Sequence, residues 1–291
     1  MTDRLVERVR RFNRTVSQRI GALDDAYLAR GRPLGQCRVL WEIGGQGCEV
    51  RTLRARLDLD SGYLSRLISA LRADGLVEMV PAADGRVRTV RLTPAGVAER
   101  EELDRRSDTL AVDILTPLDD VQRDRLVTAM GEVERLLVAS MVRVEPVDPR
   151  RPEARACIDA FVAELAARFD DGFDPGASIS AADEELEPPA GSLLVATLHA
   201  EAVACGALRF HGSWAAVKRM WVAPSARGLG LGRRILTELE AAAAARGVRT
   251  LRLETNRALT QAVALYRSAG YREVPAFNDE RYAHHWFEKE I

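Results

Sequence analysis

Helical periodicity dominates the first 75 residues of the chain. Apolar residues recur three or four positions apart, and Gly44-Gly45 and Asp74-Gly75 interrupt the pattern where glycine suits a helix end. Asp60 or Ser61 stands where an N-cap residue is expected. The pattern predicts amphipathic helices at residues 3–30, 37–43, 50–57 and from 60 or 61 to 73.

The period then changes from helix to strand. Residues 76–80 and 87–92 alternate apolar and polar side chains, and the Asp84-Gly85 between them is typical of a tight hairpin turn. Thr93-Pro94 starts a new helical pattern, because proline is tolerated in the first turn of a helix. Helical periodicity then continues to about Val142.

Prolines between residues 143 and 152 interrupt the chain and favour a domain boundary there. We therefore expect two domains, residues 1–142 and residues 143–291. The first is mostly helical, whereas strands and helices are mixed in the second, which predicts an α/β fold. The strands expected in the second domain are 142–147, 192–198, 202–210, 214–222 and 250–254, and the expected helices are 152–169, 233–246 and 258–269.

Composition limits the classes of protein to which this chain can belong. The formal net charge is −1, with 47% hydrophobic and 29% charged residues, so any DNA-binding surface is local. No stretch reaches the roughly 18 consecutive apolar residues of a membrane span, and the charged N-terminus lacks the apolar core of a secretion signal. The four cysteines are widely spaced, which favours reduced thiols and a cytoplasmic location.

The order helix, short turn, helix and hairpin is typical of a winged helix-turn-helix, whose second helix reads the major groove of DNA. The apolar face of the helix that starts at Asp60 or Ser61 turns short polar and basic residues outward. Residues 51–91 carry eight arginines against five acidic residues, a local excess that suits phosphate contacts. The candidate DNA-binding residues are Ser61, Gly62, Tyr63, Ser65, Arg66, Arg86 and Arg88.

This first domain carries a family resemblance. The segments LDLDSGYLSRLISALRADGLVE and AADGRVRTVRLTPAG resemble the MarR family of regulators, and the resemblance covers about residues 1–142. It implies that Asp84 braces Arg86 near the minor groove of an operator in double-stranded DNA. It also implies a homodimer held together by residues 3–30 and 117–140. The alternative is that the arginines form an ordinary solvated helix face.

A glycine-rich turn, RGLGLG at residues 227–232, lies between a predicted strand and a predicted helix. Backbone N–H groups at a helix N-terminus bind anions, and glycines let the backbone approach a pyrophosphate closely. A dinucleotide-binding fold uses a similar loop with an acidic residue about 20 positions later. Glu254 lies at about that distance, so spacing alone does not exclude such a fold.

The wider context of the turn resembles the GNAT acetyltransferases. RGLGLG matches that family's Arg/Gln-x-x-Gly-x-Gly/Ala signature, and AVALYRSAGY at residues 262–271 resembles its A-x-x-x-Y-x-x-x-G-Y/F segment. The resemblance covers roughly residues 142–291 and implies a mixed sheet whose central parallel strands splay apart around acetyl-CoA. The acetyl-CoA contacts that it implies are Met220, Trp221, Val222, Arg227, Gly228, Leu229, Gly230, Leu231, Gly232, Arg233 and Asn256. Relative to Tyr266, however, Asn256 stands three positions earlier than the family's common asparagine.

The resemblance also implies a chemistry: an amine attacks the thioester, and Tyr266 protonates the thiolate that leaves. A free amine has a pKa of about 10.4, so a general base would help. Relatives often carry Glu before Lys-Arg-Met, but Ala216-Val217 stands there in this chain. Glu254 is the candidate base, with an ordinary strand carboxylate as the alternative.

Arg168 and the pair His284-His285 are the remaining candidates for binding an acceptor or a metal. Arg168 is a candidate partner for a substrate carboxylate, and the pairing would be bidentate. The alternative is an ordinary surface arginine. His284-His285 lack the spacing of metal ligands, and we expect no metal.

Together the two resemblances imply a multidomain protein, in which a mostly α winged helix-turn-helix regulator precedes an α/β acetyltransferase. The expected reaction moves an acetyl group from acetyl-CoA to an amine of a small molecule or amino acid. Two alternatives stay open: a regulator whose second domain only senses acetyl-CoA, and a protein-lysine acetyltransferase. Release of CoA with a panel of amines discriminates among them.

Overall fold

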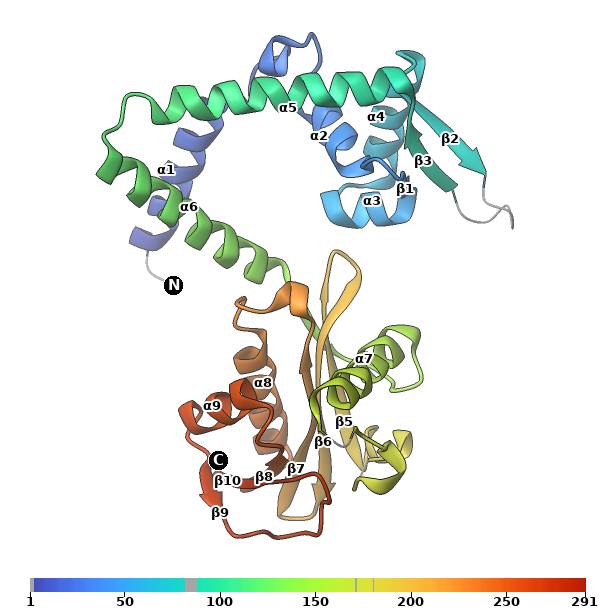
Figure 1. Ribbon diagram of the computed structural model, residues 1–291, viewed down its shortest axis with the longest axis vertical. Helices are drawn as coiled ribbons and strands as arrows, with labels where there is room; N and C mark the ends of the chain where they lie inside the picture. Colours follow the sequence, from blue (N-terminus) through green and yellow to red (C-terminus); the bar gives the residue numbers. More distant parts are fainter. Residues whose placement is uncertain (1–2, 82–87, 171, 180) are drawn as a thin grey trace. The chain divides into compact units, whose positions relative to one another are not determined.

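Two β-sheets, one of three strands and one of seven, organise the described residues, which are 3–81, 88–170, 172–179 and 181–291. In this computed structural model the chain divides into two units, Met1–Ala129 and Met130–Ile291. Helix α6 (Asp120–Met141) continues from the first unit into the second (Figure 1). The domain boundary predicted after Val142 lies just beyond the end of this helix, and it stays a prediction.

Unit 1 begins with α1 (Asp3–Arg19), which is shorter than the helix predicted over residues 3–30. Gly21 has a φ of +68°, a left-handed conformation that glycine adopts readily and that ends the helix. Tyr27 then joins the core from a short 3-10 turn, η1 (Tyr27–Ala29). The prediction of one helix through residue 30 was therefore wrong, because an apolar residue in a turn can keep helical spacing by chance.

The next three helices, α2 (Leu34–Ile43), α3 (Val50–Leu57) and α4 (Ser61–Ala73), follow the predicted pattern. Asp60 is the N-cap of α4, because its carboxylate accepts a hydrogen bond from the backbone N–H of Tyr63 at 2.8 Å. The predicted apolar face of α4 is buried. It consists of Leu64, Leu67, Ile68 and Leu71.

A three-stranded sheet of order β1-β3-β2 packs beside α4. Its strands are β1 (Cys48–Glu49), β2 (Val77–Pro81) and β3 (Arg88–Leu92), and β2 and β3 pair antiparallel as a hairpin requires. The predicted turn between them, with Asp84, Gly85 and Arg86, lies outside the described residues. Thr93 caps the following helix, α5 (Pro94–Leu115), by accepting a hydrogen bond from the N–H of Gly96 at 3.1 Å.

Unit 2 is built on the seven-stranded sheet, whose order is β4-β5-β6-β7-β8-β10-β9. Neighbouring strands are antiparallel except β7 and β8, which are parallel. The first five strands match the predicted ones within one residue at each end. The strands are β4 (Arg143–Pro146), β5 (Gly191–Leu198), β6 (Glu201–His211), β7 (Trp214–Val222), β8 (Thr250–Thr255), β9 (Arg272–Val274) and β10 (His285–Glu290).

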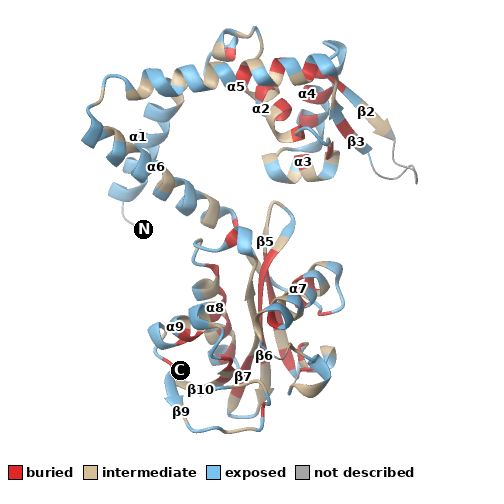
Figure 2. Cartoon of the chain, viewed as in Figure 1, coloured by how far each residue is buried: buried red, intermediate tan, exposed pale blue. Residues whose placement is uncertain are grey.

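Helices cover both faces of this sheet (Figure 1). Helix α7 (Pro152–Arg168) packs on one face and α8 (Leu231–Ala245) on the other. Because successive side chains of a strand point to opposite faces, β5 and β6 supply both cores. Buried residues accordingly line these strands and the inner sides of the helices (Figure 2). A third helix, α9 (Thr260–Ser268), follows β8.

All four cysteines are buried and free of disulfides. Burial raises the pKa of the Cys37 thiol to about 11, so this thiol stays protonated near neutral pH. Within the described part of the chain, no helix combines the length and apolar character that crossing a membrane requires.

Gly96 gives a test of how α5 packs against the sheet of unit 1. A Cβ at this position would overlap with the carbonyl oxygen of Leu76, which is backbone and has little room to move. Gly96→Ala is therefore expected to destabilise unit 1 by about 2 kcal/mol, as overpacking does. Native-state hydrogen exchange of peptides from unit 1 measures the loss.

The control is Gly45→Ala in the same unit, where a Cβ would meet nothing within 4 Å. This variant should stay within about 0.5 kcal/mol of the parent chain. Equal protection of the Gly96→Ala and Gly45→Ala chains would show that α5 does not approach Leu76 as described.

Candidate functional site

The parallel strands β7 and β8 are paired over only three positions, Trp214–Ala216 with Thr250–Arg252. Both strands continue beyond this point, to Val222 and to Thr255, without further pairing to each other among the described residues. The backbone edge of β7 from Val217 onward therefore faces an opening between the two strands. Side chains near the opening line two adjoining cavities.

A β-bulge shapes the same part of β7. Between the pairs Cys205–Trp221 and Ala207–Lys218, β7 has two residues where β6 has one. Arg219, inside the bulge, has a φ of +54°, which is uncommon for a residue with a side chain. Lys218 and Arg219, although consecutive, both line the same cavity. A regular strand would have sent them to opposite faces.

The first cavity, the loop groove, follows the glycine-rich turn into the start of α8. Gly230, with a φ of +74°, is the N-cap of α8, and no side chain caps the helix. The first N–H groups of α8 thus lack partners within the helix. Gly228, Gly230 and Gly232 line the groove, and none carries a side chain that would fill it. The predicted cofactor residues Met220, Trp221, Val222, Arg227, Leu231 and Arg233 also line it.

Glu164 of α7 organises the cationic side of the loop groove. Its carboxylate accepts hydrogen bonds from Arg227 at 2.7 Å and from the indole N–H of Trp221 at 2.9 Å. It also pairs with Arg168, four positions along α7, at 2.9 Å. Sequence reasoning singled out Arg168 and Arg227 but missed Glu164. The spacing of Glu164 and Arg168 gave one signal of this site, because residues four apart on a helix meet.

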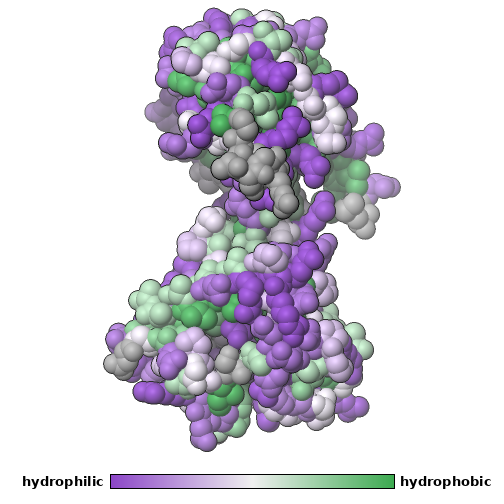
Figure 3. All heavy atoms as spheres, turned by 90° about the vertical axis from the view of Figure 1, so that its right-hand side faces the viewer, coloured by the Kyte–Doolittle hydropathy of each residue, from purple (hydrophilic) through white to green (hydrophobic). Residues whose placement is uncertain are grey.

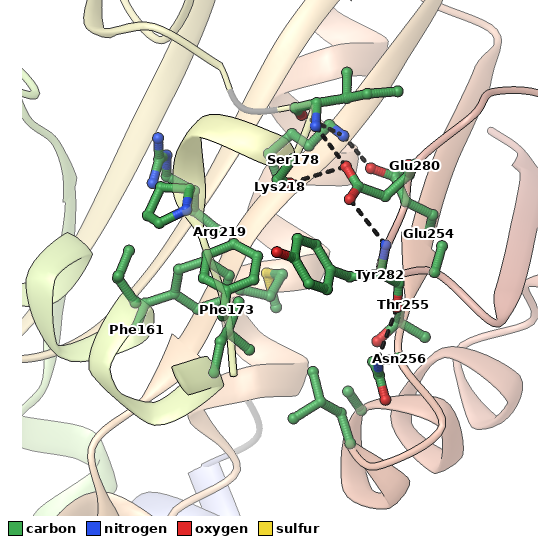
Figure 4. Close-up of a pocket in the computed structure, with 18 of the residues that line it drawn as sticks. Phe161, Phe173, Ser178, Lys218, Arg219, Glu254, Thr255, Asn256, Glu280 and Tyr282 are labelled. Atoms are coloured by element: carbon green, nitrogen blue, oxygen red, sulfur yellow. Dashed lines mark hydrogen bonds and ion pairs between the residues drawn. The ribbon is translucent and has the colours of Figure 1, made fainter. Parts of the chain in front are cut away.

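The second cavity, the aromatic pocket, lies between α7, the segment after it and the loop that precedes β10. Phe161, Phe169, Phe173 and Tyr282 are its aromatic wall residues, and it holds about 860 Å³ of empty space including its open mouth. The rings of Phe169, Phe173 and Tyr282 all contact one another, with centroids 4.9–5.8 Å apart. Figure 4 shows the ring of Phe173 next to that of Tyr282.

Charged groups occupy another part of the aromatic pocket. Lys218 of β7 and Glu254 of β8 form an ion pair across the opening between the strands, and both side chains are largely buried, at 12% and 7% exposed. The second carboxylate oxygen of Glu254 accepts a long hydrogen bond from Asn278 at 3.4 Å. The candidate base Glu254 thus lines the cavity, paired with Lys218.

Glu280 ties the two loops of the pocket together. One carboxylate oxygen accepts hydrogen bonds from the Ser178 hydroxyl at 2.9 Å and from the Ile179 N–H at 2.6 Å. The other accepts from the Tyr282 N–H at 3.2 Å. The Tyr282 hydroxyl in turn accepts from the Asp174 N–H at 3.0 Å. These contacts join residues about a hundred positions apart (Figure 4).

Tyr266 lines both cavities, together with Met220 and Leu259. Burial, and after it the Glu254 carboxylate, raises the pKa of the Tyr266 hydroxyl well above its usual range, so the group stays protonated. The hydroxyl has no hydrogen-bond partner among the described residues. Tyr266 thus keeps a protonated hydroxyl and lines both cavities.

Two predicted side chains, those of Asn256 and Arg168, lie elsewhere than expected. Asn256 lines the aromatic pocket rather than the loop groove, and its amide is bonded to the Tyr282 carbonyl at 2.7 Å and to the Ala258 N–H at 2.9 Å. Arg168, predicted to meet the acceptor, lines the loop groove. The Leu229 side chain packs against the core, and the predicted contact of its backbone N–H stays a prediction. No cluster of three or more metal-ligating side chains occurs within the described ranges.

Unit 1 has a basic hollow between α3, α4 and the two longer strands. Ser61, Ser65 and Arg88 of the predicted DNA-binding set line it, together with Arg51, Arg54, Ser69 and Arg72. Hydrophilic side chains take up much of the side of the unit that carries β2 and β3 (Figure 3).

The other predicted DNA-binding residues have separate positions. Tyr63 is partly exposed, with the Arg66 guanidinium 5.7 Å from its ring centroid, and Gly62 is exposed in the first turn of α4. Arg86 lies outside the described residues.

Models of two known protein families match two separate regions of the chain. The acetyltransferase (GNAT) family model matches residues 158–271, and the MarR family model matches residues 30–86. The chain joins a MarR-family region to a GNAT-family region. Both resemblances stated from the sequence are thereby confirmed, as is the fold class of a helical winged unit followed by an α/β unit.

Individual proteins resemble one half or the other. An IAA acetyltransferase from Azospirillum brasilense is 39% identical over 96 residues, or 32% of this chain and 63% of that protein. The chain thus covers less than two thirds of that relative. A structure named as an acyl-CoA N-acyltransferase from Klebsiella pneumoniae is 30% identical, with 52% of this chain and 98% of that one covered and a TM-score of 0.44. One named as a transcriptional regulator from Pseudomonas aeruginosa is 24% identical, with 44% and 98% covered and a TM-score of 0.38.

The Glu280 contacts give a testable property of the GNAT-region pocket. Glu280→Gln removes the charge that these three hydrogen bonds share and replaces one accepting oxygen by an amide nitrogen, so at least one of the donors Ser178, Ile179 and Tyr282 loses its acceptor. Hydrogen bonds to charged groups contribute ~1.5–3 kcal/mol, so amide exchange in residues 172–179 should accelerate by about tenfold or more. Hydrogen-exchange mass spectrometry measures this exchange rate.

The matched control is Asp279→Asn, which removes the same charge from the neighbouring exposed residue. It should leave exchange in residues 172–179 unchanged. If both variants behave alike, Glu280 does not hold this segment.

Proposed function

We propose that the GNAT region transfers an acetyl group from acetyl-CoA to an amine. The observation that carries this proposal is the opening between β7 and β8, where the loop groove and the aromatic pocket share Tyr266 and Met220. One cavity has the features of an anion and thioester site, and the other is lined by apolar rings. A donor and an acceptor bound in the two cavities would meet at Tyr266.

The residues of the loop groove fit the donor. Glycines at positions 228, 230 and 232 leave the turn without side chains, and the free N–H groups at the start of α8 face an anion such as a pyrophosphate favourably. The unpaired backbone edge of β7 at Met220 and Val222 offers amide groups to the pantetheine arm. Arg227 and Arg233 add positive charge at the same groove.

The transfer balances with the side chains present. The acceptor enters as an ammonium ion and loses one proton, and its nitrogen lone pair then attacks the thioester carbonyl carbon. The carbon–sulfur bond breaks as the carbon–nitrogen bond forms. The thiolate takes a proton from Tyr266, and the second proton of the nitrogen leaves through Glu254 or solvent, so the products are the amide, CoA and one proton. Tyr266 recovers its proton from solvent.

Gly230 provides the test of the donor site. Gly230→Asp places a carboxylate next to the proposed pyrophosphate, so acetyl-CoA affinity by calorimetry should fall by about a hundredfold. Gly212→Asp is the control, because Gly212 has a nearly equal φ of +72° and open space, and it lies in the turn between β6 and β7. It shares the backbone strain without touching the groove.

The same samples distinguish an acetyltransferase from a domain that only senses acetyl-CoA. Release of CoA with amines by the parent chain and its loss in Gly230→Asp agree with acetyl transfer. Acetyl-CoA binding without CoA release for any amine would favour the sensor. Equal acetyl-CoA affinity in the Gly230→Asp and Gly212→Asp chains would contradict the donor site itself.

We further propose that unit 1 binds double-stranded DNA as a homodimer. The basic hollow beside α4 supports the first part, because arginines at positions 51, 54, 72 and 88 gather around the outward serines of that helix. Helix α1 supports the second. It has no buried residue, yet it exposes Leu5, Val9 and Phe12 at 61%, 58% and 43%. A 17-residue helix is marginal alone, so a second copy that covers this face would stabilise it.

Arg54→Ala tests the DNA surface. If Arg54 contacts a phosphate, the variant should weaken binding uniformly across sequences and reduce the salt slope of log affinity by about 1. The measurement is fluorescence anisotropy with random 30-base-pair duplexes over a series of salt concentrations. Arg249→Ala, an exposed arginine in unit 2, removes the same charge and should change neither quantity. An unchanged slope in Arg54→Ala would remove Arg54 from the DNA contact.

A further inference from the structure

The aromatic pocket has a wall of apolar rings beside its charged groups. The rings of Phe169, Phe173 and Tyr282 enclose one part of it, and Phe161 extends the same wall. All four rings are only partly buried in the protein itself. A ligand that covers them gains free energy from the apolar surface that it removes from water. A polar chain such as a polyamine would not make this gain.

The wall of rings is held in position by hydrogen bonds among residues that line the pocket or lie next to it. The Tyr282 hydroxyl is bonded to the Asp174 N–H at 3.0 Å, and Glu280 is bonded to Ser178, Ile179 and the Tyr282 N–H. The ring edges therefore keep their arrangement before a ligand enters. Offset and edge-on ring contacts of this kind add to the burial of an aromatic guest.

The two cationic side chains of the pocket, Lys218 and Arg219, are both engaged by other groups of the protein. Lys218 is already paired with Glu254 and lies 3.4 Å from the Ile179 carbonyl oxygen. One guanidinium nitrogen of Arg219 donates to the Ala181 carbonyl at 2.9 Å. A carboxylate on the acceptor would have to displace these contacts and approach Glu254 and Glu280, which repel it. An ammonium group, by contrast, is attracted by the same two carboxylates.

We infer that the acceptor is a primary amine on an aromatic or similarly bulky apolar group, without a carboxylate. Its ring contacts Phe169, Phe173 and Tyr282, and its nitrogen lies near Glu254 and Tyr266. This assignment rests on the proposed acetyl transfer and names the substrate class of the same site. The bonds formed and broken are those of the transfer described above.

A matched set of amines tests the class. 2-Phenylethylamine has the ring and the amine, phenylalanine adds only a carboxylate, and n-butylamine lacks the ring. CoA release with 2-phenylethylamine should have a kcat/KM at least about tenfold above those of phenylalanine, n-butylamine and spermidine. A kcat/KM for phenylalanine or spermidine equal to or above that of 2-phenylethylamine would overturn the inference and leave acetyl transfer standing.

A variant ties the preference to the rings. Phe173→Ala should raise the KM for 2-phenylethylamine by about tenfold while the KM for n-butylamine changes little. Phe277→Ala, on the same loop as Tyr282 but outside the pocket lining, is the control and should leave both values unchanged. Parallel changes for the two amines in Phe173→Ala would also overturn the inference.

A binding measurement separates failure of the inference from failure of the reaction. If no amine supports CoA release, the proposed transfer is wrong, and calorimetric titration with 2-phenylethylamine decides the inference alone. Binding that Phe173→Ala abolishes and Phe277→Ala preserves would support the aromatic class. Absence of binding to the parent chain would overturn it.

Discussion

The early end of pairing between β7 and β8 is the constraint from which the rest of the GNAT-region site follows. Parallel strands joined over three residue pairs leave the backbone of β7 beyond Ala216 without a partner on that side. Unpaired backbone groups need hydrogen-bond partners, and the pantetheine arm proposed above has amides of the right kind. The same opening admits side chains from both strands, which is how Lys218 and Glu254 come into contact.

The elements around the opening depend on one another through polar contacts between distant residues. Glu164 of α7 fixes Arg227 beside the glycine-rich turn, and Glu280 fixes the segment after α7 against the loop before β10. Each carboxylate is satisfied by more than one donor, so each accepting group is well compensated for burial. Charged residues thus join the segments that surround the loop groove and the aromatic pocket.

Much of this architecture could be predicted from short patterns of neighbouring residues in the sequence. Asp60 and Thr93 cap helices where short polar residues were expected, and the turn at Gly228–Gly232 leads into α8 as anion-binding loops do. The positions of Met220 and Tyr266 followed from motif resemblance. Neighbouring residues decide these features, so a sequence pattern is enough to predict them.

The remaining features depend on contacts that sequence spacing does not encode. Strand β10 inserts between β8 and β9, and only this insertion brings Glu280 and Tyr282 to the residues after α7. Asn256 was assigned to the groove by motif, but its amide is occupied by backbone groups that arrive with the same loop. Gly21 ended α1 early, because a single positive φ outweighs continued apolar spacing.

The proposed acetyl transfer is tested most directly at Tyr266, the proposed proton donor. The Tyr266→Phe chain keeps the ring that lines both cavities and lacks only the hydroxyl. Stopped-flow measurement of CoA release, with acetyl-CoA affinity measured by calorimetry on the same sample, separates proton donation from binding. The account predicts a fall in kcat of about a hundredfold with unchanged acetyl-CoA affinity. An unchanged kcat would contradict it, because the two cavities would then meet at a residue that takes no part in the transfer.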